Sequence, residues 1–224
     1  GVVVGPRVLT SISQIQGGTL TPDQLRDRVR QAKTQGADVI KFFASGSIRD
    51  GGKMNVTQEQ VDAVCGEAKA QGLRAVVHAH DPDSVKAAVK GGCSQIEHGL
   101  FADDSAIAAM KAANVFFDPN IGLVLQNYLR NKDKYMGSGN FNDEGFAAME
   151  KVLPNLEIVF KKALAAGLRG DLPEGERKRR EAGQQCAEPT HTVCAFAPFH
   201  RRLNAPFRRL SPSDIASAAS AQAD

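Results

Sequence analysis

The feature that most constrains the fold of this chain is a pattern repeated over residues 1–168. A short apolar run, a polar turn and an amphipathic stretch closed by glycine follow one another several times. The apolar runs are typical of buried strands, and the amphipathic stretches are typical of helices. Successive strands joined by helices run parallel, because each crossover returns the chain to the same edge of the sheet. The pattern therefore predicts an α/β fold.

The same pattern gives the expected elements their boundaries. Thr21 and Asp81, each followed by proline, are helix N-cap signals, and Thr57 with a glutamine three residues later forms a capping box. Chemistry in such folds lies at the carboxyl ends of the strands. Strands are expected at 2–10, 38–43, 73–80, 94–97 and 114–118, and helices at 21–36, 57–72, 83–90, 103–113 and 143–166, the last interrupted or kinked at Pro154.

Composition excludes several classes of function. The 224 residues carry a formal net charge of only +3, so we expect neither a nucleic-acid partner nor a membrane-surface partner. The apolar stretches fall far short of the roughly 20 residues that a membrane helix needs. Four scattered cysteines, Cys65, Cys93, Cys186 and Cys194, form no dense framework, and we expect them to be reduced.

Chemistry-bearing side chains follow three consecutive predicted strands. Lys41 lies within an apolar strand, His78 and His80 end the next strand, and His98 ends the one after it. Alternate side chains of a strand share a face, so His78 and His80 point together. A lysine in an apolar strand must shift its pKa, form a Schiff base or become an anionic carbamate that binds metal. Imidazole with a carboxylate-like oxygen suits zinc, manganese or iron, so the spacing predicts a metal site.

Residues 119–142 form a longer connection than a compact fold normally contains. The segment holds Tyr128, Tyr135 and a Gly-Ser-Gly sequence at 137–139. Two interpretations stay open for this segment. It is either a lid that contributes substrate contacts, or a surface excursion without a role.

Four segments, Gly5–Thr10, Ile40–Gly46, Val77–His80 and Ile96–Gly99, occur in an order that is typical of a known family. Over residues 1–168 the chain resembles the middle of the amidohydrolase superfamily, in particular the imidazolonepropionase-like and Xaa-Pro dipeptidase branch. The resemblance implies a (β/α)8 TIM-type barrel, of which this chain would form a part. It also implies metal-assisted hydrolysis of C–N bonds in amides or peptides.

The resemblance implies a role for each site residue. Lys41 would be the carboxylated lysine that bridges two metals, and His78 and His98 would be metal ligands from the next two strands. His80 would lie near the substrate or exchange roles with His78, and we place Arg7 and Tyr128 at the substrate as well. The implied cofactor is a divalent metal, zinc, binuclear in intact members. The implied partner is a small amide or dipeptide, and oligomerisation is left open.

Two parts of the family pattern are missing from this sequence. No His-x-His pair precedes Lys41, and the general acid/base aspartate normally stands in a Gly-Thr-Asp context after a helix like 155–168. Asp171 lies near that place, but no apolar strand precedes it to direct its side chain, so we assign it no catalytic role. We therefore expect an incomplete fragment with little or no turnover.

The sequence changes character after Leu168. Residues 169–224 hold eight arginines and one lysine, whereas residues 1–168 hold seven arginines and twelve lysines. We expect no strand at 169–185 and interpret 169–224 as an irregular tail, either disordered or the product of a shifted reading frame. A set of Cys and His residues within this tail matches no strong zinc signature; its members are Cys186, His191, Cys194 and His200.

Two other functions stay open. A Schiff-base aldolase would use Lys41 as its nucleophile, but that reaction gives the three histidines no role. A truncated remnant would have no catalytic function. The chain starts inside an apolar run without a leader pattern, so localisation is undetermined: cytoplasmic by default, with a secreted or periplasmic site as the alternative.

Overall fold

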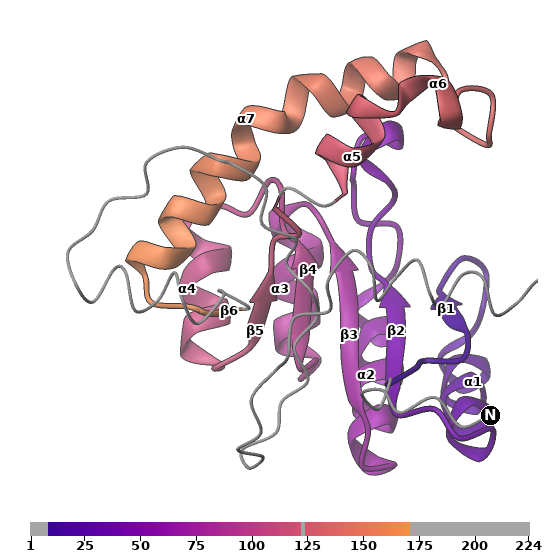
Figure 1. Cartoon of the computed structure of the whole chain (residues 1–224). Coiled ribbons are helices and arrows are strands. Elements are labelled where there is room, and N and C mark those ends of the chain that lie inside the picture. The colour runs from indigo at the N-terminus through magenta and orange to yellow at the C-terminus, as the bar shows by residue number, and fades with distance from the viewer. Residues whose placement is uncertain (1–8, 122–123, 171–224) are drawn as a thin grey trace, which may run out of the picture. The chain divides into compact units, whose positions relative to one another are not determined.

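The structure is a computed structural model that describes residues 9–121 and 124–170. Its strands form one parallel sheet in the order β1-β2-β3-β4-β5-β6, with helices between them (Figure 1). The strands are β1 (Gln14–Gln16), β2 (Val39–Phe43), β3 (Arg74–Ala79), β4 (Gln95–His98), β5 (Phe116–Asp118) and β6 (Arg169–Gly170). The helices are α1 (Pro22–Thr34), η1 (Ile48–Asp50), α2 (Gln58–Ala70), α3 (Pro82–Lys90), α4 (Asp104–Ala112), α5 (Leu125–Arg130), α6 (Lys132–Tyr135) and α7 (Asp143–Ala165).

The predicted α/β class with parallel strands is confirmed. Each strand pairs in parallel with its neighbour in the sequence, as expected for successive strands connected by helices. Within the described residues the sheet is open, because β1 and β6 each pair with one neighbour. This arrangement is that of a partial barrel.

The predicted helix starts are confirmed by their caps. The Thr21 and Thr57 side chains each accept a hydrogen bond from the backbone N–H three residues on, and both sites form complete capping boxes. Asp81 caps α3, where its Oδ1 accepts from the N–H of Ser84 at 3.1 Å. Its Oδ2 accepts from the N–H of Met54 at 3.1 Å, which ties the loop after β2 to the end of β3.

Two apolar clusters stabilise the structure. The larger one lies between the sheet and helices α1 to α4, which cover one face of it (Figure 1). Alternate strand residues supply its sheet side, and Ile40, Val77 and Ile96 are each at most 1% exposed. The smaller cluster packs η1 and α5 against α7 at the carboxyl end of the strands, through Ile48, Leu125 and Phe146 among others.

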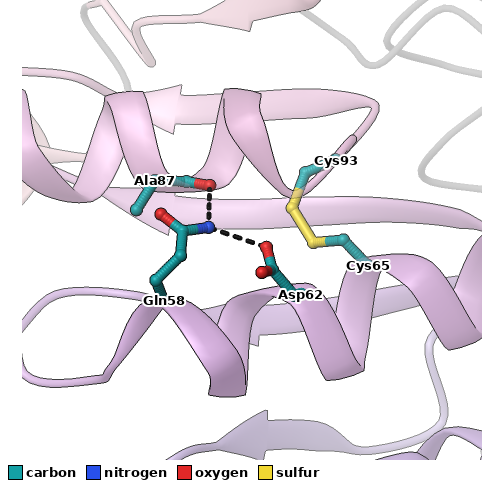
Figure 2. The surroundings of a disulfide bond; sticks show 5 residues. All are labelled: Gln58, Asp62, Cys65, Ala87 and Cys93. Atoms are coloured by element: carbon teal, nitrogen blue, oxygen red, sulfur yellow. Dashed lines mark hydrogen bonds between the residues drawn. A yellow bond between two sulfur atoms is a disulfide. The ribbon is translucent and has the colours of Figure 1, made fainter.

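A disulfide joins Cys65 of α2 to Cys93, which follows α3, so the expectation of reduced thiols is wrong for this pair. The two cysteines lie 28 residues apart in sequence, but parallel packing of α2 beside α3 brings their Cα atoms to 5.1 Å. Figure 2 shows a second link between the same helices, in which the Gln58 amide of α2 donates to the Ala87 carbonyl of α3 at 3.1 Å. Within α2 the same amide also donates to Asp62 Oδ1 at 2.7 Å. The spacing of the two cysteines in the sequence gives no indication that they lie close together in the fold.

Three details of the fold differ from expectation. Strand β1 was missed because its polar ends leave Ile15 as its one buried residue. Strand β6 forms immediately after Leu168, where no strand was expected, and Arg169 stacks over the Phe116 ring with 4.3 Å from guanidinium carbon to ring centroid. Helix α7 runs through Pro154 without interruption.

The segment 119–142 contains helices α5 and α6. Three aromatic rings in this part of the chain, Tyr128, Tyr135 and Phe141, lie in contact, with centroid separations from 4.8 to 5.5 Å. Its role as a lid stays a prediction. Among the helices of the described ranges, none is long and apolar enough to span a membrane.

Candidate active site

The side chains singled out from the sequence meet in one cavity. A hollow of about 320 Å³ is lined by Lys41, His78, His80 and His98 from consecutive strand ends, and by Tyr128 from α5. The carboxyl ends of parallel strands meet at one edge of the sheet, which explains the convergence. Five of the residues predicted for the site are therefore brought together.

Strand alternation places the lysine and the first imidazole on the cavity face. In β2 and β3, residues on the helix-covered face are fully buried, whereas Lys41, Phe43 and His78 lie on the other face and are partly exposed. The strand register pairs Phe43 with His78 and His78 with Glu97, so these side chains form a row across the sheet.

His98 reaches the cavity by a different route. Its Cα pairs with that of Ala79, whose side chain is buried on the helix-covered face. His98 has φ of 71°, a left-handed conformation that non-glycine residues rarely adopt. This left-handed backbone directs the ring of His98 toward the rings of His78 and His80. Such a conformation costs about 1–3 kcal/mol and tends to be found at functional sites.

The three imidazoles form a compact group. Ring centroids are 4.4 Å apart for His78 and His80, 4.7 Å for His78 and His98, and 5.0 Å for His80 and His98. Burial lowers the pKa of His78 to about 4 and the pKa of His98 to about 3. Burial also lowers the pKa of His80 well below its ordinary value. All three rings are therefore neutral near pH 7.

The hydrogen bonds of the imidazoles leave ring nitrogens available. His78 Nε2 lies 3.3 Å from the Gly46 carbonyl oxygen, to which it donates when that nitrogen carries the proton. The Nδ1 of His80 is buried without a hydrogen-bond partner among the described residues, and His80 is only 4% exposed. A buried nitrogen without a partner is costly, and a ligand in the cavity would relieve this cost.

Lys41 contacts the carboxylate of Glu97 through its ammonium group. Burial lowers the pKa of Lys41 to about 8, and the carboxylate of Asp118 opposes this shift. The side chains of Lys41 and Glu97 are 19% and 14% exposed, so the pair is shielded from bulk water. A substantial fraction of neutral amine at physiological pH is unusual for lysine.

The donor chemistry of this group fits a divalent metal. Neutral imidazole is the form that binds zinc, and three such rings stand together here. Within 9–121 and 124–170, however, no group of three or more His, Cys, Asp or Glu side chains is arranged to hold a metal ion. The residue types therefore match a metal site, but their present arrangement does not form one.

The remaining candidates fall elsewhere. Arg7 and Asp171 lie outside the described residues, as do the Cys and His residues of the tail. The domain boundary near Leu168 also stays a prediction, because residues 171–224 lie outside the described part.

Two residues of the cavity region received no role from the sequence. Glu97 could have been found by alternation from buried Ile96, which places Glu97 on the same face as Lys41. Arg49 lines the cavity from η1 and carried no pattern of its own. The one indication in the sequence was the position of Arg49 in the loop that follows β2.

A sequence profile of the amidohydrolase family matches residues 1–179. The chain belongs to the amidohydrolase family. This amidohydrolase-family chain is similar to the solved structure of a Xaa-Pro dipeptidase with bound methionine in the active site, at 32% identity and a TM-score of 0.58, over 66% of this chain and 37% of that one.

Two further relatives agree with this membership. A putative prolidase from Bifidobacterium longum is 27% identical with a TM-score of 0.57, over 66% of this chain and 37% of that structure. Ochratoxinase from Aspergillus niger is 30% identical over 99 residues, which make up 42% of this chain and 21% of that protein. The chain thus spans well under half of the length of these relatives. The suspected family is confirmed, and the roles of individual residues stay predictions.

Proposed function

We propose that this member of the amidohydrolase family serves metal-dependent hydrolysis of C–N bonds in small amides or dipeptides. The observation that carries the proposal is the convergence of Lys41, His78 and His98 on one cavity with His80 beside them. The names of its relatives, a Xaa-Pro dipeptidase, a putative prolidase and ochratoxinase, support this class of reaction.

In this proposal Lys41, His78 and His98 would hold the metal, and His80 would contact the substrate or exchange roles with His78. The metal, zinc by preference and binuclear in the intact family, would supply an activated water and polarise the scissile carbonyl. The low pKa values of His78 and His98 keep both rings in the neutral, ligand-competent state.

The lowered pKa of Lys41 supports its proposed modification. A neutral amine adds to carbon dioxide and releases one proton, which gives the anionic carbamate. Glu97 holds the charged form of Lys41 in place when the carbamate is absent. Tyr128 lines the same cavity from α5, where its hydroxyl is available to a substrate.

Hydrolysis of a panel of Xaa-Pro dipeptides and N-acetyl amino acids tests the proposal. The chain should take up zinc or manganese and show at most slow turnover, which chelation and the variant His98→Asn both abolish. His191→Asn, which changes a histidine elsewhere in the chain, should behave like the wild type. Turnover that survives chelation, or a chain that takes up no metal, would contradict the proposal and favour a non-catalytic remnant.

One observation favours a second candidate function. A lysine with a pKa of about 8 in a shielded cavity is also suited to form a Schiff base with a carbonyl substrate. Borohydride with an aldehyde substrate separates the two functions. Reductive trapping at Lys41 would support the aldolase, whereas a carbamate forms no reducible imine.

A further inference from the structure

We infer that Arg49 binds a carboxylate of the substrate, so that the cavity selects amides that carry a free acid group. This inference rests on the proposed function and names the substrate class of the same site. Arg49 lines the cavity together with the three imidazoles, so a molecule that fills the cavity meets both groups. A volume of about 320 Å³ suits a small amide of this kind.

The guanidinium group of Arg49 is held from two sides. Its Nε donates to Asn140 Oδ1 at 2.5 Å, and its central carbon lies 3.8 Å from the ring centroid of Phe141. Both contacts come from a segment about ninety residues further along the chain, so the arrangement depends on the tertiary fold. A guanidinium fixed through Nε and stacked on a ring presents its two Nη groups in a defined plane, which matches the geometry of a carboxylate.

The acidic residue that follows Arg49 in the sequence does not pair with this cation directly. Asp50 accepts a hydrogen bond from the Asn140 amide at 2.7 Å. Among the described residues, the Arg49 guanidinium forms no ion pair within 4.0 Å, and its side-chain hydrogen bond there is the Nε contact with Asn140. Burial lowers the pKa of Arg49, against the opposing influence of Tyr128 and Asp50. A half-buried cation without a direct counter-ion gains most from an anionic ligand.

The rest of the cavity wall indicates what stands next to the carboxylate. Apolar side chains from several elements line it, among them Ile48, Leu100, Leu125, Met149 and Leu156. The combination of one oriented guanidinium with an apolar wall fits an N-acyl amino acid, or a dipeptide, with an apolar side chain near its free acid group.

Calorimetric titration with a matched pair of ligands tests the inference. N-acetyl-L-leucine carries the carboxylate, and N-acetyl-L-leucine amide has the same size without the charge. The full chain is titrated in chelator, so that binding is measured without hydrolysis. The wild type should bind the acid about 10- to 100-fold more tightly than the amide, as expected for a charge-assisted pair.

Three variants sharpen the test. Arg49→Gln should abolish the preference for the acid, and Arg49→Lys, which keeps the charge but loses the planar fork, should retain part of it. Arg28→Gln removes the same charge from an exposed position on α1 and should leave the preference intact. Circular dichroism checks that each variant is folded. If Arg49→Gln does not fold, the ligand preference of Arg49→Lys tests the inference in its place.

Several outcomes would overturn the inference: a wild type that binds neither ligand, a wild type without preference, or an Arg49→Gln chain that keeps the preference. The last outcome would assign the carboxylate to another cation such as Lys41. Failure of hydrolysis alone leaves the binding result unaffected. Hydrolysis of neutral and acidic amides at equal rates would overturn the inference while sparing the proposed function.

Discussion

The ring of His98 lies 4.7 Å from that of His78, although the backbone of His98 is paired with Ala79, whose side chain lies on the opposite face of the sheet. The left-handed backbone at His98, with φ of 71°, accounts for this position. A chain in regular β conformation would turn this imidazole away from the cavity. The strained residue is therefore what completes the group of imidazoles.

The glycine after His98 should be indispensable to this turn. Gly99 has φ of 54°, and a Cβ there would lie 2.7 Å from the Phe117 ring. Gly99→Ala should lower the free energy of unfolding by about 2–4 kcal/mol, from backbone strain together with the steric overlap. Urea denaturation measures the loss. Gly92→Ala is the control, because Gly92 has φ of 78° with open space around it and should lose only the backbone part. Equal losses would refute the role of Phe117.

Acidification should destabilise the metal-free protein. His78 and His98 have folded-state pKa values of about 4 and about 3, below the ordinary value near 6.5. Between these values the unfolded chain binds protons that the folded chain does not, so stability falls as pH decreases from about 7 to 4. At pH 5 the part due to His98 should be about 2 kcal/mol. Denaturation at several pH values checks this, and His98→Asn should show a shallower decrease. An identical pH dependence in both proteins would contradict the assignment.

Removal of the Glu97 carboxylate should lower the stability of the fold, because the shielded Lys41 ammonium loses the carboxylate that it contacts. Glu97→Gln leaves the Lys41 ammonium without the carboxylate it contacts, and stability at pH 7 should fall by about 2 kcal/mol. Thermal denaturation at pH 7 measures the change. Glu157→Gln removes one partner of an exposed ion pair with Lys161 and should leave the stability nearly unchanged. Similar effects of the two variants would show that the Lys41–Glu97 contact is not shielded.

The Cys65–Cys93 disulfide should stabilise the α2–α3 pair. Closing a loop of this length, with a sequence separation of 28, is worth about 3.6 kcal/mol, so a reducing agent should lower the melting temperature. The double variant Cys65→Ser, Cys93→Ser should melt at the reduced temperature and no longer respond to the agent. Detection of both cysteines as free thiols in denatured, unreduced protein would contradict the bond.

Much of the fold could be predicted from local signals. The caps at Thr21, Thr57 and Asp81 and the apolar runs of β2 to β5 lie in continuous sequence, where periodicity and hydrogen-bonding preferences act directly. The parallel order of the strands followed from the helices between them. Strand β1 was missed because three residues with one buried side chain carry no periodicity.

The candidate site was predictable only where strand geometry governs it. Lys41 and His78 followed from alternation and from parallel strand ends, and Glu97 could have been added by the same reasoning. The orientation of Arg49 depends on Asn140 and Phe141, about ninety residues away, and no local pattern encodes that contact. The disulfide could not be predicted for the same reason, because the packing of α2 beside α3 brings its two cysteines together.

The most direct test of the central claim is a zinc titration followed by the ring-nitrogen NMR signals of the histidines. If Lys41, His78 and His98 share one ion, the signals of His78 and His98 should change together at the same zinc equivalents, while those of His191 and His200 stay constant. Substitution of Lys41 by methionine should weaken both changes. Signals of His78 and His98 that respond at different zinc concentrations, or not at all, would show that these rings do not form a metal site.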